Sequence, residues 1–365
     1  MFADIYRGKK VIITGHTGFK GSWLSLWLLQ LGARVYGVSD EVPTKPSLFE
    51  TLKLKDLLTD HRLDIRDREG VRQLIETIQP DFVFHLAAQP IVSVSYQDPV
   101  GTFATNVMGT AHILDALRGL KGNCTCVVIS SDKCYENEEW VWGYKETDKL
   151  GGKDIYSASK GATEIVFKSY YHSFFKNSAN IRLVSARAGN VIGGGDWAVD
   201  RIIPDCMRAW SQNQPVEIRS PKATRPWQHV LEPLSGYLLL GQLATQDFSL
   251  HGESFNFGPT MDSNYSVLSL LKDISSKWSY NNDIEPYILT GNQPFHEAGL
   301  LKVNCEKALF YLKWLPVLTY KELIEMTSDW YYKFYHGEDD LYQFTLTQLE
   351  LFQSLAKEKK LEWAI

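Results

Sequence analysis

The chain has few cysteines and no excess of positive charge. Its five cysteines are scattered over 365 residues, and Cys124 and Cys126 are separated by a single residue, a spacing unsuited to a metal or redox pair. We therefore expect reduced thiols that act as packing residues, and no ligand spacing predicts a metal site. The formal net charge of −5 argues against broad electrostatic binding of nucleic acid.

Long apolar runs are also missing, and no stretch is apolar for long enough to cross a bilayer. Residues 1–10 are polar and lead directly into an apolar run at 11–13, which is not the pattern of a signal peptide. These features predict a cytoplasmic protein with no membrane partner. A chain of 365 residues that is 44% hydrophobic exceeds one average core, so we expect two lobes.

Strand and helix patterns alternate along the first half of the chain. The predicted strands lie at 11–14, 34–38, 81–86, 125–130 and 181–186, and the predicted helices at 22–31, 67–78, 102–117 and 159–175. Strands that alternate with helices of this length predict a parallel sheet with helices on both faces. Right-handed crossovers then give a doubly wound α/β fold.

The pattern changes after Arg187. Three consecutive glycines at 193–195 and prolines at 204, 215, 221, 226 and 233 interrupt the alternation, which predicts a smaller, loop-rich second lobe. The run 255–257 predicts one more strand, which could return to the first sheet. The tail, residues 320–363, has a helical pattern with a break near Gly337.

A glycine-rich turn follows the first predicted strand, with glycines at 15, 18 and 21. Gly15 permits a tight turn, Gly18 lets the backbone approach a pyrophosphate, and Gly21 lets the next helix pack closely on the sheet. The N-terminus of that helix supplies N–H groups and positive potential for an anion. The turn predicts a Rossmann-type, dinucleotide-binding domain over residues 1–188, completed by about 228–259.

The end of the second strand bears on the choice of cofactor. Ser39 stands where such domains usually carry an acid for the adenosine ribose, and Asp40 comes one residue later. The hydroxyl leaves the choice between NAD and NADP less sharply set, and we expect NAD because no arginine follows closely. Asp64 and Ile65 are candidates for contact with the adenine edge, and a solvated loop acid is an equal alternative for Asp64.

Tyr156 and Lys160 form a YxxxK pair, in which the lysine lies one helical turn beyond the tyrosine. A nearby ammonium favours phenolate, so this spacing predicts a pKa for Tyr156 lowered towards neutrality. Alone, the spacing is common. Its combination with the glycine turn indicates a catalytic pair beside a dinucleotide.

At these residues the chain resembles the extended short-chain dehydrogenase/reductase family, and the segments 85–88, 105–110 and 130–132 extend the match. Within that family it is most similar to the sugar-nucleotide 4,6-dehydratases. Many of these have Thr-Asp-Glu where this chain has Ser131, Asp132 and Lys133. The lysine, together with the segment 189–197, resembles the branch that acts on CDP-glucose.

The resemblance implies an NAD-dependent lyase that converts CDP-D-glucose to CDP-4-keto-6-deoxy-D-glucose. Tyr156 would take the proton of the 4-hydroxyl, Ser131 would hydrogen-bond the same oxygen, and Lys160 would hold Tyr156 and the nicotinamide ribose. Asp132, if protonated, would donate to the departing 6-hydroxyl. Lys133 would occupy the position of the base at C5.

The role of Lys133 has two alternatives. An ordinary lysine is protonated at neutral pH and cannot accept a proton, so burial or a neighbouring charge would have to neutralise Lys133 before it could act as the base. Otherwise a water serves as the base and Lys133 steadies the enolate electrostatically. The sequence leaves both open.

The resemblance also implies the binding residues. The cofactor would contact Gly15, His16, Gly18, Phe19, Gly21, Ser39, Asp64, Ile65, Ala87, Ala88, Asn106, Tyr156 and Lys160. The nucleotide sugar would contact Gln89, Asn190, Arg201, Arg225 and His296, mostly in a substrate-binding lobe over 189–227 and 260–365. Arginine suits the phosphates because its planar fork binds two oxygens at once.

Two other functions stay open. A C4-epimerase of a nucleotide sugar is the first alternative, although epimerisation needs no acid–base pair at 132 and 133 for losing water. A non-catalytic sensor that binds the cofactor is the second, although Ser131, Tyr156 and Lys160 are all present.

The family also pairs two helices across a two-fold axis, which implies a homodimer or homotetramer. The corresponding helices here are predicted at 102–117 and 159–175. We expect them to carry an exposed apolar patch that includes Val107, Ile113, Leu114, Val166, Phe167, Tyr170 and Tyr171.

Overall fold

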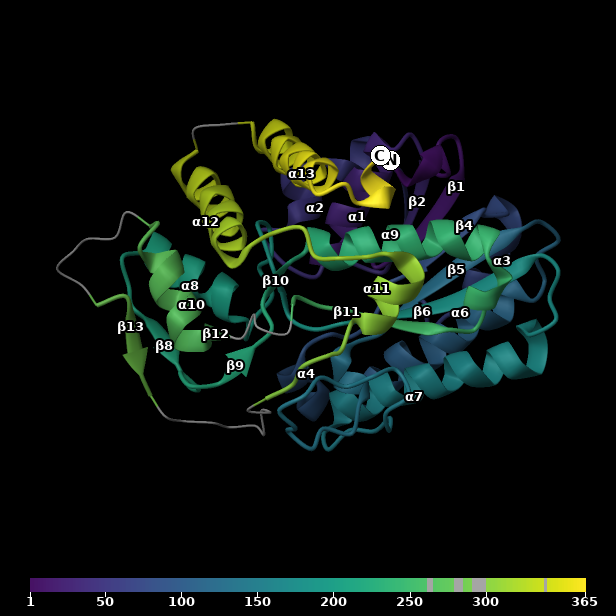
Figure 1. Ribbon diagram of the computed structural model, residues 1–365, viewed down its shortest axis with the longest axis horizontal. Coiled ribbons are helices and arrows are strands. Elements are labelled where there is room, and N and C mark those ends of the chain that lie inside the picture. Colours follow the sequence, from purple (N-terminus) through teal and green to yellow (C-terminus); the bar gives the residue numbers. More distant parts are fainter. Residues whose placement is uncertain (261–264, 279–284, 291–299, 338–339) are drawn as a thin grey trace.

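The computed structural model describes residues 1–260, 265–278, 285–290, 300–337 and 340–365. Its centre is a seven-stranded sheet in the order β11-β6-β5-β4-β1-β2-β3, and all neighbouring strands are parallel (Figure 1). The strands are β1 (Lys10–Thr14), β2 (Arg34–Ser39), β3 (Thr59–Arg62), β4 (Phe82–His85), β5 (Cys124–Ile129), β6 (Ile181–Ala188) and β11 (Ser254–Phe257). The predicted doubly wound α/β fold is confirmed.

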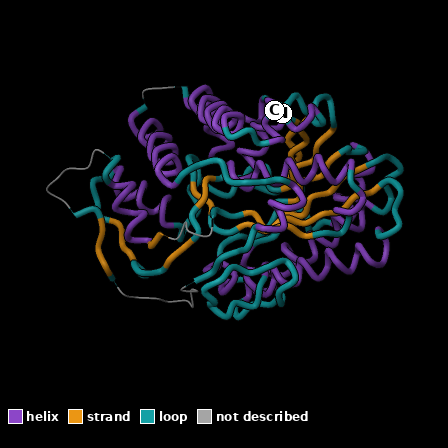
Figure 2. Tube along the Cα trace, viewed as in Figure 1, coloured by secondary structure: helices purple, strands orange, loops and turns teal. Residues whose placement is uncertain are grey.

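Alternate residues of the strands face two separate hydrophobic cores. In β5, Val127 and Ile129 share a core with α1 (Phe19–Gln30) and α9 (Leu231–Gln246). Cys126 and Val128 face the other core, with α3 (Arg68–Ile78), α6 (Gly109–Leu117) and α7 (Ile155–Tyr170). Helices therefore cover both faces of the sheet (Figure 2), which is why its central strands read as continuous apolar runs.

The helix that carries the YxxxK pair starts earlier than its pattern predicts. The carboxylate of Asp154 accepts the backbone N–H of Ser157 at 2.9 Å and caps α7 before Ile155. Tyr156 thus lies in the first helical turn. The helix continues beyond Tyr170 as a π-helical turn, Tyr171–Phe175, and the predicted helix at 102–117 is likewise composed of α5 (Pro99–Phe103), a π-helical turn (Ala104–Met108) and α6.

The second half is richer in helices than the sequence predicts. It contains α8 (Ile202–Ser211), α9, α10 (Val267–Ser275), α11 (Glu306–Leu312), α12 (Tyr320–His336) and α13 (Leu341–Glu358), with the short strands β7 (Val191–Ile192), β8 (Val216–Ile218), β9 (Thr224–Arg225), β10 (Gln228–His229), β12 (Tyr265–Ser266) and β13 (Tyr287–Leu289). The expectation of a loop-rich region is wrong here. Nearly every side chain of α9 is buried, so this helix lacks the polar face that would reveal its periodicity.

Two predictions for this half are confirmed. The run at 255–257 belongs to β11, which extends the main sheet by pairing with β6. Gly337, with φ of 67°, ends α12 in a left-handed conformation, where the tail was expected to break.

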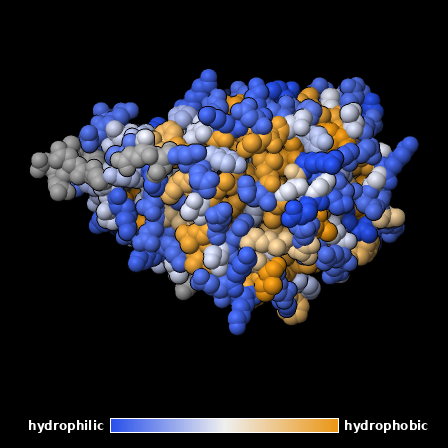
Figure 3. Space-filling view, turned by 90° about the horizontal axis from the view of Figure 1, so that it is seen from above, coloured by the Kyte–Doolittle hydropathy of each residue, from blue (hydrophilic) through white to orange (hydrophobic). Residues whose placement is uncertain are grey.

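The two chain ends lie side by side (Figure 1), where the rings of Phe2 and Trp363 stack with their centroids 5.1 Å apart. All five cysteines are free, as expected. Among the described residues, no helix is both long and apolar enough to span a membrane. Figure 3 shows hydrophobic patches interrupted by hydrophilic side chains, the mixed surface usual for a globular protein.

Candidate active site

A cavity of about 1170 Å³ opens at the carboxyl ends of the parallel strands. Its walls include the turn after β1, the end of β2, and the segments that follow β4, β5 and β6. The strand order reverses between β1 and β4, and ligands of open α/β sheets bind at such a switch point. The second half contributes the opposite wall, including Arg201, Arg225 and Trp227.

The glycine turn brings backbone to one wall of the cavity, beside Thr17, Phe19 and Lys20. Gly15 has φ of +76°, and a Cβ there would lie 2.9 Å from the backbone of Ala87. A Cβ on Gly21 would lie 2.1 Å from the carbonyl oxygen of Gly15. Gly18 precedes α1 in an extended conformation. The turn therefore exposes backbone and a helix N-terminus to the cavity, which fits the pyrophosphate of a dinucleotide.

His16 does not line this cavity. It is fully buried, with Nδ1 at 3.0 Å from the Ser39 hydroxyl and Nε2 at 2.9 Å from Asp60. Asp60 also accepts from Arg62 at 2.9 Å. Ser39 does line the cavity, so His16 orients the hydroxyl predicted to meet the ribose, and Asp60 holds His16.

The remaining predicted cofactor residues also fall into two groups, those that line the cavity and those that support its wall. Phe19, Asp64, Ile65, Ala87 and Ala88 line the cavity. A hydrogen bond from the Arg66 guanidinium holds the pKa of Asp64 below its ordinary value. Asn106 is buried behind the wall, where its side-chain oxygen accepts the backbone N–H of Gln89 at 2.7 Å. It supports the loop that carries Gln89.

The predicted catalytic residues come together at the centre of the cavity. Tyr156 and Lys160 face it from α7, and Ser131, Asp132 and Lys133 face it from the turn after β5. The Lys160 ammonium lies 5.9 Å from the centroid of the Tyr156 ring. The turn after β5 and the helix α7 that follows it in the chain thus contribute to one site.

Burial dominates the titration of the YxxxK pair. It raises the pKa of Tyr156 to about 12, although a hydrogen bond with Ser131 opposes it. It lowers the pKa of Lys160 to about 8. The expectation that Lys160 would bring the pKa of Tyr156 towards neutrality is wrong for the chain by itself, because loss of water destabilises the phenolate more than the neighbouring charges stabilise it.

Asp132 is suited to hold a proton. It is 3% exposed, and burial raises the pKa of its carboxyl, although the nearby charge of Lys133 and a hydrogen bond from Ser131 at 3.0 Å act in the opposite direction. Lys133 is half-buried, and its backbone N–H donates to the Ser131 hydroxyl at 3.2 Å. A buried carboxyl with a raised pKa and a lysine side chain therefore line the same cavity as Tyr156.

Four of the five predicted substrate residues line the cavity: Gln89, Asn190, Arg201 and Arg225. Arg201 donates to Asp196 at 2.9 Å, and Arg225, which is 5% exposed, donates to the Thr224 carbonyl at 2.9 Å. Arg201 and Arg225 thus bring two guanidiniums to the cavity, the first of them paired with a carboxylate. His296 lies outside the described residues.

The sequence reasoning missed Lys20. Its side chain lies in the first turn of α1 and lines the cavity, where burial and the charge of Arg201 lower its pKa to about 8. Asp196 was also missed as a cavity residue and as the partner of Arg201. A lysine at an otherwise apolar helix start was the available signal for Lys20.

Known protein structures share the architecture of this chain. An epimerase from Methanothermobacter thermautotrophicus aligns with a TM-score of 0.77 at 21% identity, covering 92% of this chain and 97% of that one. A dTDP-glucose 4,6-dehydratase from Bacillus anthracis in complex with NAD aligns with a TM-score of 0.74 at 18% identity, covering 92% and 100%. Both structures therefore share the fold of this chain.

Sequence comparison identifies the family. The family described as GDP-mannose 4,6 dehydratase matches residues 12–327, and the chain belongs to it. It is 47% identical over 344 residues to CDP-glucose 4,6-dehydratase of Salmonella typhimurium, covering 93% of this chain and 94% of that protein. It is also 26% identical to CDP-paratose 2-epimerase of Salmonella typhi, covering 88% and 98%. The resemblance to the sugar-nucleotide 4,6-dehydratases is thereby confirmed.

Proposed function

We propose that the protein is an NAD-dependent dehydratase that converts CDP-D-glucose to CDP-4-keto-6-deoxy-D-glucose. The observation that carries this proposal is the buried carboxyl of Asp132, whose pKa burial raises and which lies beside Lys133 in the cavity that contains Tyr156. Loss of water from C5 and C6 needs an acid for the leaving hydroxyl, whereas epimerisation at C4 does not. The likeness to the Salmonella CDP-glucose enzyme supports the choice of substrate.

The residues present fit NAD. The bare backbone of the glycine turn would hold the pyrophosphate, Ser39 the adenosine ribose, and Lys160 the nicotinamide ribose. The chemistry that NAD supplies when bound is acceptance of a hydride from C4 and its return to C6. Arg62 does not line the cavity, and Arg66, which does, is paired with Asp64, which supports NAD over NADP.

Proton transfer would be the work of three side chains. In its phenolate form the Tyr156 oxygen takes the proton of the 4-hydroxyl, while the Ser131 hydroxyl hydrogen-bonds the same oxygen of the sugar. The resulting ketone acidifies the hydrogen at C5. The C5 proton passes either to a water, with the charge of Lys133 steadying the enolate, or to the neutral amine of Lys133, and Asp132 gives its proton to the departing 6-hydroxyl.

The substrate would lie between the two halves of the chain. We assign the cofactor to residues 1–188, completed by about 228–259, and the nucleotide sugar to 189–227 and 260–365. In support, Arg201 and Arg225 line the same cavity as the glycine turn, and paired guanidinium donors suit the two phosphates of a nucleoside diphosphate.

Part of the surface expected for association is buried within the chain. Ile113, Leu114 and Phe167 are at most 2% exposed and pack beneath the sheet, so they are wrong as interface residues. Other apolar side chains of the same region are exposed, namely Phe103, Met108, Ile165 and Phe174, at 36–56%. We propose that this second set forms the contact of a homodimer or homotetramer.

A single incubation separates the functions. Purified protein is mixed with NAD and CDP-glucose, and the products are separated and treated with alkali. A 4-keto product that absorbs in alkali is expected. Formation of CDP-galactose instead would identify a C4-epimerase, and no turnover would indicate a cofactor-binding sensor. Parallel incubations with dTDP-glucose and GDP-mannose test the base, and the larger rate is expected with CDP-glucose.

A further inference from the structure

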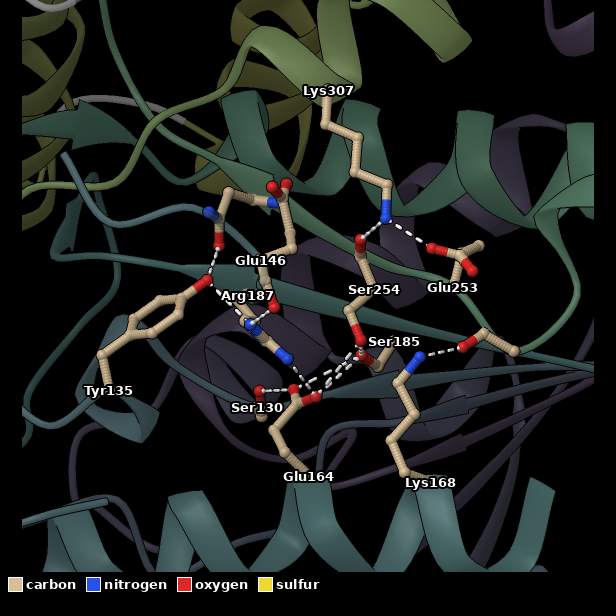
Figure 4. A network of polar contacts seen from close by, with 12 residues as sticks. Ser130, Tyr135, Glu146, Glu164, Lys168, Ser185, Arg187, Glu253, Ser254 and Lys307 are labelled. Carbon is tan, nitrogen blue, oxygen red and sulfur yellow. Dashed lines mark hydrogen bonds and ion pairs between the residues drawn. The ribbon is translucent and has the colours of Figure 1, made fainter. Parts of the chain in front are cut away.

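A fully buried ion pair lies directly behind the catalytic residues. Glu164 follows Lys160 by one turn on α7, and its carboxylate accepts from the Arg187 guanidinium of β6 at 2.7 Å (Figure 4). Both side chains are at most 2% exposed. Burial alone would raise the pKa of Glu164. The charge of Arg187 and the hydrogen bonds that the Glu164 carboxylate accepts together outweigh this effect and hold the pKa below its ordinary value. The pair is therefore charged, and burying it carries a large desolvation cost.

The carboxylate binds the segment that enters the active site. It accepts the hydroxyl of Ser130, the residue directly after β5. Two further hydroxyls complete its shell, from Ser185 at 3.1 Å and Ser254 at 3.3 Å. These come from the neighbouring strands β6 and β11, so Glu164 joins helix α7 to three adjacent strands of the sheet.

The guanidinium binds the segment that leaves the active site. Its second terminal nitrogen donates to the Tyr135 hydroxyl at 2.7 Å, and its central carbon lies 5.0 Å from the centroid of the Tyr135 ring. The hydroxyl in turn donates to Asn256 at 2.8 Å. Figure 4 shows Tyr135 and Ser130 approaching the ion pair from different directions.

Ser130 and Tyr135 immediately flank the turn 131–134, which contains Ser131, Asp132 and Lys133. The hydrogen bonds within this turn are local, such as the backbone N–H of Cys134 to the Ser131 carbonyl at 3.1 Å. Local bonds fix the shape of a turn but not its position relative to α7. That position depends on contacts beyond the turn. The Gly151 backbone N–H donates to the Cys134 carbonyl at 2.9 Å, and the ion pair adds contacts to Ser130 and Tyr135 at the two ends.

We propose that Glu164 and Arg187 are positioning residues, which clamp both ends of the 131–134 turn and so align Asp132 and Lys133 with Tyr156 and Lys160. The inference rests on the proposed function, because alignment matters for a reaction in which residues of the turn and of α7 act on one sugar. A displacement of about 1 Å in such a site lowers the rate about a hundredfold. Neither Glu164 nor Arg187 is among the residues that line the cavity.

The test removes one tether at a time. Glu164→Ala would leave the buried guanidinium without a counter-charge and would unfold the protein, so the informative variants are Ser130→Ala and Tyr135→Phe. The matched control is Lys307→Met. It breaks the ion pair of Lys307 with Glu253 at 2.6 Å, in the same network but without contact to the 131–134 turn.

In both tether variants we expect the kcat for 4-keto product to fall by about ten- to a hundredfold, with the KM for CDP-glucose nearly unchanged. Reduced nicotinamide should accumulate, because Tyr156 and Lys160 stay in place on α7 while the elimination residues shift. Hydrogen exchange of the backbone amides of 131–135 should also become faster than in the control. This second readout needs no turnover.

The outcomes separate the two claims. If the wild-type protein makes no 4-keto product but the amides of 131–135 exchange faster only in the tether variants, the proposed function fails and the clamp stands. If both variants match Lys307→Met in kcat and in exchange, the clamp is overturned. A rise in KM at unchanged kcat would also overturn it, since that result places the tethers in substrate binding.

Discussion

Replacing Asp132 by asparagine tests the role assigned to its carboxyl. The change keeps the size of the side chain and removes the proton that the carboxyl would give to the 6-hydroxyl. General acid catalysis accelerates a reaction by about 10²- to 10⁴-fold, which corresponds to about 3–5 kcal/mol of barrier. We therefore expect Asp132→Asn to lower the rate of product formation by that factor. Oxidation at C4 should persist, because it depends on Tyr156.

The same change should not weaken the fold. Burial raises the pKa of Asp132, so the folded protein binds this proton more tightly than the unfolded chain does. Stability then falls as the pH rises above the ordinary carboxyl pKa towards the raised one, and an uncharged amide avoids that loss. Asp132→Asn should therefore melt at the same or a higher temperature than the wild type at neutral pH, and the difference should vanish in acid.

The assay measures 4-keto product and reduced nicotinamide side by side, with melting curves at several pH values. Asp329→Asn is the control, because desolvation also raises the pKa of that carboxyl on α12, but Asp329 is exposed and lies outside the cavity-lining residues. It should leave the rate unchanged. Undiminished product formation by Asp132→Asn would refute the assignment of the general acid, and a large loss of stability would refute the electrostatic reasoning.

Four further outcomes are expected. Tyr156→Phe should abolish oxidation at C4, because the oxygen that takes the proton is gone, and comparable turnover would contradict this. Lys133→Ala should oxidise C4 but stall before water is lost, leaving reduced nicotinamide on the enzyme; normal flux to product would exclude Lys133 from the elimination. Ser39→Asp should shift the ratio of dissociation constants towards NAD over NADP, because a carboxylate repels the 2′-phosphate, and an unmoved ratio would mean that Ser39 does not face the ribose. In sedimentation at micromolar concentration the wild type should exceed the 41.6 kDa of one chain, and Ile165→Asp should reduce the association; a wild-type monomer would remove the proposed interface.

Local sequence determined the parts of the site that lie within a few residues of each other. The turn with Gly15, Gly18 and Gly21 could be predicted from the sequence because a strand, a tight turn and a helix start follow one another directly. The pair of Tyr156 and Lys160 could be predicted because residues four positions apart lie one turn apart on the same side of a helix. Such patterns depend on backbone geometry, which the sequence carries by itself.

Other features have no local pattern. Helix α9 is buried on nearly every side, so its sequence shows no periodicity, and the edge strand β3, with the sequence Thr-Asp-His-Arg, has no apolar run. Two residues of the predicted interface, Ile113 and Leu114, are buried within the chain, and the sequence could not show this for a related reason. Periodicity shows that Ile113 and Leu114 share an apolar helix face, but not whether the parent sheet or a second chain covers that face.

Tertiary structure alone decided which polar side chains face the ligand cavity. His16 belongs to the glycine turn, yet its ring points away from the cavity towards Asp60, 44 residues further along the chain. In the sequence, Glu164 and Arg187 look like an ordinary acid and an ordinary base. Only the order of β5, β6 and β11 places their side chains together, buried from solvent. Charges that are distant in sequence interact strongly only once the packed sheet has excluded solvent, so their partners follow from the fold and not from the spacing.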